Sequence, residues 1–235
     1  SSTLLGTYRF RSHVAATEFL LQNRITRPLG QYLTGVLLAN QRAAGGNTTY
    51  FLGTVSSSGY TIYFPLLYAV KEQIILHMLT LAALIGFILR VIKRNISAPL
   101  STRVRIWTAS HMGLVAGLVV ISVYWGISLV SPLNIGLRHV LPTFPFIYIL
   151  VAYGMQRLAT IDALDNQRNW YTHIPAILSV VVSIIMAIVA IRAYPYYLPY
   201  YNALGGGTEN GYHIAVDSNY DWGQDFKRLR AYMDE

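Results

Sequence analysis

The stretch IILHMLTLAALIGFILRVI, residues 74–92, decides the fold class of this chain. Nearly all of its side chains are apolar, and the exceptions are few, namely His77, Thr80 and Arg90. A helix needs about 20 consecutive, predominantly apolar residues to cross the hydrocarbon core of a bilayer. The stretch therefore predicts a membrane-spanning helix.

Three further stretches have the length and composition of a span or come close to it. They are IWTASHMGLVAGLVVISVYWGISLV (106–130), the shorter VLPTFPFIYILVAYGM (140–155) and IPAILSVVVSIIMAIVAIRA (174–193). Pro142 and Pro145 are expected to kink the second of these near its start. The whole chain is 54% hydrophobic and only 12% charged, against about 25% charged residues in soluble domains.

These features predict an all-α polytopic membrane protein, a bundle of about four transmembrane helices with external loops. We expect residues 1–60 to form an external loop region with short helices, 61–193 the transmembrane bundle, and 194–235 an external tail that starts an amphipathic helix. The chain opens at a serine without a signal-like segment and stops within the polar AYMDE, so we expect a fragment of a longer protein. The absence of cysteine excludes disulfides and thiolate metal sites.

The orientation follows from the connector RVIKRNISAPLSTRVR, residues 90–105. It contains several basic residues and no acidic one: Arg90, Lys93, Arg94, Arg103 and Arg105. Short loops rich in Lys and Arg face the cytoplasm, whereas long segments cross the membrane largely regardless of charge. We therefore expect a multi-pass protein of the cell membrane in which 90–105 is cytoplasmic. By alternation, residues 1–60, the loop 131–138 and the tail 194–235 are external.

The tail contains DSNYDWGQDF, residues 217–226, whose acids could bind a metal ion or shape a helix end. Asp217, Asn219 and Asp221 match the opening of a calcium-binding loop. Trp222 stands where that loop needs glycine, and Arg228 where it needs a bidentate glutamate. We therefore expect no metal site and no firm cofactor, with a divalent cation as the less favoured alternative.

A second interpretation of the same stretch is a helix cap. Asp221 and Gln224 have the spacing of a capping box, and apolar residues follow at helical spacing. A cap requires only these two side chains. It leaves Asp217, Asn219 and Trp222 unexplained, which keeps a functional role open for them.

Three cations near predicted span ends are candidates for binding an anion. Arg138 and His139 stand where the loop 131–138 enters the third predicted span, and Lys71 follows the apolar YFPLLYAV. Such side chains can simply extend to the lipid headgroups, and Lys71 can also pair with Glu72. Alternatively, the planar guanidinium of Arg138 suits two oxygens of a phosphate.

Two histidines lie inside predicted spans without a second metal ligand one turn away. They are His77 and His111. We expect polar contacts within the bundle for both, not metal binding.

Four motifs carry a resemblance to a known family. They are YFLGTVSSSGYTIYFPLLYAVKEQI (50–74), NIGLRHVLPTFPFIYIL (134–150), YYLPYYNALGGG (196–207) and DSNYDWGQDFKRL (217–229). In this order they resemble the C-terminal half of glycosyltransferase family 39 proteins, which have the GT-C fold and are related to protein O-mannosyltransferases and aminoarabinose lipid A transferases. The similarity covers roughly residues 50 to 232.

The resemblance implies an inverting membrane glycosyltransferase that moves a sugar from a polyprenyl phosphate to an acceptor hydroxyl on the external face. The catalytic base of that family is an acid upstream of residue 1, so this chain alone is expected to be inactive. We expect Arg138, His139 and Lys71 to contact the donor phosphate, and Asp217, Asn219 and Trp222 to face the acceptor cleft.

The expected partners are a lipid-linked sugar donor, membrane lipid, and an acceptor that is a glycan, a lipid or a protein, with no nucleic acid. The alternative is a non-catalytic transporter or assembly subunit whose external acids bind a cation or a partner. Transporters of many folds contain internal repeats, and the four stretches show none, which favours the enzyme.

Overall fold

The computed structural model describes residues 11–93, 99–159 and 174–234, and within them the chain is mostly helical, as predicted. The helices are α2 (Arg11–Gln22), α3 (Arg27–Gly45), α4 (Tyr63–Lys71), α5 (Ile74–Lys93), α6 (Leu100–Ser110), α7 (Met112–Val130), α8 (Phe144–Ala159), α9 (Ile174–Ala193) and α10 (Phe226–Met233). One antiparallel hairpin joins β1 (Thr49–Phe51) to β2 (Thr54–Ser56). Short 3-10 turns include η1 (Leu137–His139), η2 (Leu141–Thr143) and η7 (Asp217–Asn219).

Two helices in the described part of the chain are long and apolar enough to cross a membrane by length and composition, in α5 (Ile74–Val91) and in α7 (Met112–Val130). Large apolar side chains stand exposed along both helices, for example Phe87 and Ile127. Extended exposed apolar surfaces mark contact with a membrane or with another protein. Because these surfaces belong to helices of spanning length, they indicate association with a membrane.

The other two predicted spans correspond to shorter apolar helices. α9 contributes the apolar stretch Ile177–Ala193. α8 has 16 residues and begins at Phe144, not at Val140. The expected proline kink is wrong, because Pro142 lies in the preceding turn η2 and Pro145 in the first turn of α8, where a missing backbone N–H costs nothing.

Small residues bring α5 and α8 into close contact. A Cβ placed on Gly86 would lie 2.0 Å from Leu158 Cδ2, and one placed on Gly154 would lie 2.6 Å from the Cβ of Ala83. Such small residues let helices approach closely inside a bilayer, where packing replaces the hydrophobic effect. α5 and α8 therefore pack closely against one another.

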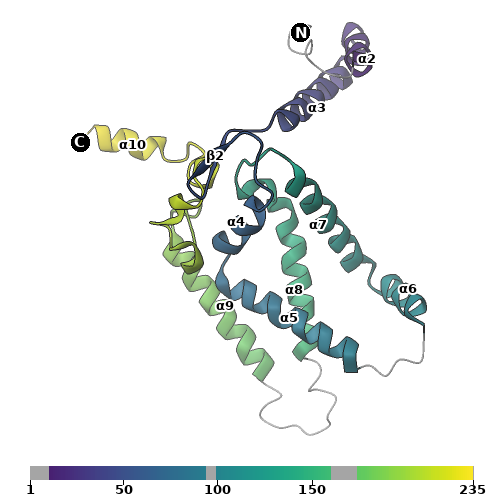
Figure 1. The fold of residues 1–235 in the computed structure, drawn as a ribbon, viewed down its shortest axis with the longest axis vertical. Coiled ribbons are helices and arrows are strands. Elements are labelled where there is room, and N and C mark those ends of the chain that lie inside the picture. Colours follow the sequence, from purple (N-terminus) through teal and green to yellow (C-terminus); the bar gives the residue numbers. More distant parts are fainter. Residues whose placement is uncertain (1–10, 94–98, 160–173, 235) are drawn as a thin grey trace.

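The N-terminal segment forms a helical hairpin in which α2 packs against α3 (Figure 1). The described helices are longer than the short helices predicted for this region, since α3 alone has 19 residues. At the other terminus, α10 points away from the bundle (Figure 1), and none of its residues is buried.

The buried core lies where three distant segments of the chain meet. Its residues are Phe51, Tyr63, Phe64, Leu67, Val70, Leu137, Val140, Phe144, Tyr201 and Ala215. They come from the β-hairpin with α4, from the loop between α7 and α8, and from the tail. In Figure 1 this cluster lies at one end of the helices, opposite the end of α5 and the start of α9. The β-hairpin with α4, the loop before α8 and the tail therefore pack into one unit.

Candidate functional site

The loop before α8 is docked onto the DSN turn of the tail by several hydrogen bonds. The Ser218 hydroxyl donates to the Ile135 carbonyl, and the Leu137 N–H donates to Asn219 Oδ1 at 3.2 Å. The Gly136 N–H donates to the Tyr63 hydroxyl at 3.1 Å. We call this unit, residues 135–139 with 217–222 and Tyr63, the docked platform.

Gly136 is the residue that allows this approach. Its φ is +89°, a region that side chains rarely adopt. A Cβ at this position would also lie 2.8 Å from the Ser218 hydroxyl oxygen. The loop and the turn thus meet backbone to backbone, which fixes the residue that follows two places later, Arg138.

Arg138 and Trp222 lie together on the surface of the docked platform. The guanidinium carbon of Arg138 is 5.4 Å from the centre of the Trp222 ring. The Trp222 indole N–H donates to the Ser218 carbonyl at 2.6 Å, while half of the Trp222 surface stays exposed. The structure therefore brings together a predicted phosphate ligand and a predicted acceptor contact from positions far apart in the chain.

His139 lies beneath Arg138 and is half-buried. Its ring stacks on Phe64 with 5.5 Å between the ring centres. Burial, and then the neighbouring Arg138 charge, lower the pKa of His139. The His139 ring packs on an aromatic ring and supports the loop that carries Arg138.

Asp217 and Asn219 have opposite environments. The Asp217 side chain is exposed, and its backbone has φ of +59°. Asn219 is 1% exposed, so the prediction that it faces a cleft is wrong. Its amide donates to the Tyr63 hydroxyl at 3.0 Å and to the Val216 carbonyl at 3.1 Å, so Asn219 joins the parts of the docked platform internally.

The pKa of the Tyr63 hydroxyl is affected by charged side chains of the docked platform. Its pKa is raised, chiefly because the ring is buried, and hydrogen bonds from Asn219 and Gly136 oppose the rise. The Asp217 carboxylate raises the same pKa and the Arg138 guanidinium lowers it. Both charges thus lie near one buried hydroxyl, with Asp217 and Arg138 on the surface above it.

Lys71 occupies the interior of the network. Its Nζ donates to the carbonyls of Leu198 and Asn219, both at 2.9 Å. It also lies 4.1 Å from the centre of the Tyr201 ring. Lys71 therefore does not extend to lipid headgroups, and it stands behind Asn219, not beside Arg138.

The alternative of a Lys71–Glu72 ion pair is also wrong. The Glu72 carboxylate accepts a hydrogen bond from the Tyr148 hydroxyl at 3.0 Å, and burial raises the pKa of Glu72. Lys71 bonds backbone carbonyls because α4 ends at this residue and directs its side chain towards the tail. Its role in the site is to hold the start of the tail against Asn219.

Lys71 should make the stability of the protein depend on pH. Burial lowers the pKa of the Lys71 ammonium to about 7, whereas an unfolded lysine titrates near about 10.4. The unfolded state binds more protons between these values, so stability rises as the pH increases from about 7 to about 10. We expect Tm of the parental protein minus Tm of Lys71→Met to increase over this window, measured by tryptophan fluorescence in one detergent.

The matched control is Lys227→Met, which removes an exposed lysine on α10. Its Tm difference from the parental protein should be the same at each pH. A Tm difference for Lys71→Met that is equally constant from pH 7 to 10 would contradict a buried, titrating amine.

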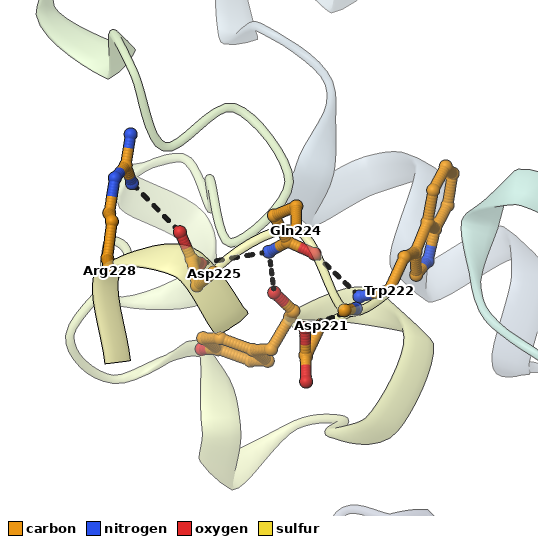
Figure 2. Close-up of polar contacts among 7 residues, drawn as sticks. Asp221, Trp222, Gln224, Asp225 and Arg228 are labelled. Carbon is orange, nitrogen blue, oxygen red and sulfur yellow. Dashed lines mark hydrogen bonds and ion pairs between the residues drawn. The ribbon is translucent and has the colours of Figure 1, made fainter. Parts of the chain in front are cut away.

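The turn from Asp221 to Gln224 is built differently from the predicted cap. The Gly223 N–H donates to Asp221 Oδ1 at 2.6 Å. The Trp222 N–H donates to Gln224 Oε1, also at 2.6 Å (Figure 2). The Gln224 amide donates to the Tyr220 carbonyl at 3.1 Å. α10 begins only at Phe226, so the prediction that Asp221 and Gln224 cap it is wrong. They close a tight turn instead, and this turn holds Trp222.

Three residues of the network were not singled out from the sequence. Tyr63, Ser218 and Asn202 each look ordinary in their local context. Asn202 is buried, and its amide donates to the carbonyls of Ala69 and Glu72 at 2.8 and 2.6 Å. Its position directly before ALGGG is the one signal that could have revealed it, since asparagine commonly precedes such turns.

The remaining candidates behave as polar contacts within the helices. His77 bonds the Ala69 carbonyl at 3.0 Å, and His111 bonds the Trp107 carbonyl at 2.9 Å, as expected for both. Over residues 11–93, 99–159 and 174–234, no group of three or more His, Asp or Glu side chains lies close enough to hold a metal ion.

The structure thus places Arg138, Trp222 and Asp217 on one exposed surface, with Asn219, Tyr63 and Lys71 beneath it. Comparison of the chain with family models, with curated proteins and with solved structures found no match.

Proposed function

We propose that this chain is the C-terminal part of a polytopic membrane glycosyltransferase. The enzyme moves a sugar, with inversion, from a polyprenyl phosphate to an acceptor hydroxyl on the external face. One contact supports this function most directly: the exposed Arg138 guanidinium stacked beside the exposed Trp222 ring.

Arg138 has the properties required of a phosphate ligand. Neither ion pair found among the described residues includes it. A contact of the guanidinium with an aromatic ring leaves N–H groups for two oxygens of one phosphate. The anchored loop 135–139 fixes its position before the substrate arrives, which is the preorganisation that electrostatic catalysis requires.

The reaction is a displacement at the anomeric carbon. The acceptor oxygen forms a bond to this carbon while the bond to the phosphate oxygen breaks, and the electron pair leaves with the phosphate. Arg138 stabilises the charge that develops on the leaving oxygen. The acceptor proton passes to a carboxylate expected upstream of residue 1, so the residues described here bind and orient the two substrates.

In this proposal, Asp217 and Trp222 bind the acceptor. A carboxylate accepts hydrogen bonds from hydroxyl groups, and the exposed indole face packs against C–H surface. Both residues come from the same tail segment as Asn219, which is buried, so Asn219 supports the acceptor side without touching the substrate. Lys71 and His139 likewise support the Arg138 loop from below.

The proposed membrane arrangement has four spans, α5, α7, α8 and α9, with the docked platform at the external end. This arrangement predicts opposite accessibility for Ser101 in α6 and Thr208 in the tail, both of which are exposed. Since the chain contains no cysteine, Ser101→Cys and Thr208→Cys can be labelled individually. On intact cells, an impermeant maleimide should label position 208 and should label position 101 only after permeabilisation. The reverse pattern would overturn the orientation.

The activity itself can be tested with the full-length protein in membrane vesicles. Polyprenyl phosphates carrying different hexoses are offered as donors, and release of the free polyprenyl phosphate is measured with and without a hydroxyl acceptor. Acceptor-dependent release from at least one donor is expected. No release from any of them would favour the non-catalytic transporter or assembly subunit.

A further inference from the structure

A small cavity lies next to the docked platform, between the start of the tail and the start of α10. It has a volume of about 170 Å³ and is lined by Pro195, Tyr196, Leu198, Pro199, Gln224, Asp225 and Arg228. In Figure 2, Asp225 and Arg228 lie on the opposite side of the 221–224 turn from the Trp222 ring. The cavity is therefore a separate space from the Arg138–Trp222 surface, and the same turn shapes both.

The polar wall of the cavity is ordered by contacts among its own residues. Asp225 Oδ1 accepts from Arg228 Nη1 at 2.9 Å, and Asp225 Oδ2 accepts from Gln224 Nε2 at 3.1 Å. The Arg228 guanidinium also lies 4.9 Å from the centre of the Tyr196 ring. The lining thus combines bonded polar side chains from the 224–228 segment with the apolar Leu198 and two prolines.

The charges and the size of the cavity restrict its ligand. Asp225 and Arg228 neutralise one another, so an anion would meet the carboxylate and a cation would meet the guanidinium. An entirely apolar ligand would cover the remaining N–H groups of Arg228 and the remaining lone pairs of Asp225 without hydrogen-bonding them, which is costly. At about 30 Å³ per water molecule, the volume corresponds to about six waters, enough for one ring with several hydroxyl groups.

We propose that this cavity binds one neutral pyranose ring, a sugar unit of the acceptor that lies beside the hydroxyl to be glycosylated. Ring hydroxyls match the remaining lone pairs of the Asp225 carboxylate and the remaining N–H groups of Arg228. The C–H surface of the ring matches Leu198, the two prolines and Tyr196. This inference rests on the proposed function and assigns its acceptor to the carbohydrates.

Binding can be measured without catalysis. The full-length protein in lipid nanodiscs is titrated with the methyl pyranosides of mannose, glucose and galactose, using saturation-transfer difference NMR. Glucuronate and glucosamine serve as charged comparison ligands. At least one neutral pyranoside should bind more tightly than both charged sugars. Asp225→Asn keeps the shape of the side chain and should weaken this binding at least tenfold, and Arg228→Gln should do the same.

α10 offers a matched control. Arg230 and Asp234 form a second ion pair, 3.7 Å apart and highly exposed, which does not line the cavity. Asp234→Asn and Arg230→Gln should leave pyranoside binding unchanged. Arg228→Lys retains the charge without the planar fork, so its dissociation constant for the pyranoside should lie between those of the parental protein and Arg228→Gln. An unchanged Tm for each cavity variant checks that it is folded.

Three outcomes would overturn the inference: no binding of any pyranoside, tighter binding of a charged sugar, or equal loss in Asp225→Asn and Asp234→Asn. None of them depends on transfer from the lipid donor. Failure of donor cleavage with intact pyranoside binding would instead reject the proposed function, so the two results remain distinguishable.

Discussion

Replacing Arg138 with alanine in the full-length protein should reduce sugar transfer by about 10²–10³-fold, the usual loss when one preorganised group that stabilises developing charge is removed. Arg138 has this position because the docked platform fixes its loop and Trp222 covers one side of its guanidinium. The rate of donor consumption at saturating donor is the quantity to measure. The stability of the protein should change little, because Arg138 is exposed.

Two variants distinguish a phosphate ligand from a cation that merely contacts headgroups. Arg138→Lys retains the charge and loses the fork that binds two oxygens, so transfer should still fall substantially. Arg192→Ala removes another exposed arginine, at the end of α9, and should transfer at the parental rate. Parental activity in Arg138→Ala would show that the residue is only an anchor at the membrane surface.

Replacing Asn219 with alanine should cause a large loss of stability. The Leu137 N–H would lose its acceptor, and the Tyr63 hydroxyl would lose a donor, both in buried surroundings. The unpaired Leu137 N–H costs about 1–3 kcal/mol. The Tyr63 hydroxyl still accepts from the Gly136 N–H, so its lost bond costs only about 1 kcal/mol, and we expect about 2–4 kcal/mol in total. A marked fall in Tm, with transfer lost in parallel, is the expected result.

Asn210→Ala is the control for this experiment. Asn210 is exposed, and its amide makes one local bond, to the Gly206 carbonyl at 2.9 Å. Its removal should shift Tm only slightly, because water replaces the lost partner. Equal Tm values for the Asn210 and Asn219 variants would refute the idea that Asn219 holds the platform together.

The helices were predictable wherever the sequence signal is local. The runs that became α5 and α7 are apolar over the length of a bilayer, and no tertiary contact is needed to recognise them. The start of α8 was predicted four residues too early, at Val140, because a hydropathy window does not register that Pro142 closes a 3-10 turn before the helix begins.

The sequence predicted which residue types belong to the site, but only partly where each of them lies. Arg138 and Trp222 were chosen because of what a guanidinium and an indole can bind. Asn219 was misplaced because its partners Leu137 and Tyr63 are 82 and 156 residues away. Lys71 was misplaced for the same reason, since its acceptors lie 127 and 148 residues further along the chain. No periodic pattern carries such information.

The predicted cap failed for a local reason. Asp221 and Gln224 have the correct spacing for a capping box, but Gly223 between them adopts φ of +81°. This conformation lets both side chains bond to N–H groups inside the turn, which competes with helix initiation. The helix consequently starts one turn later, at Phe226.

The hydrogen-bonded residues of the docked platform lie far apart in the chain, and this separation determines the order in which the parts of the platform can form during translation. Gly136 can bond to Tyr63 as soon as the loop is made, but the bonds of Ile135 to Ser218 and of Leu137 to Asn219 require a segment that is translated about 80 residues later. Closing a loop of that length has an entropic cost that local helix formation does not share. Arg138 therefore acquires its final position only after the tail has been synthesised, so in the proposed enzyme the phosphate site would form after the preceding helices.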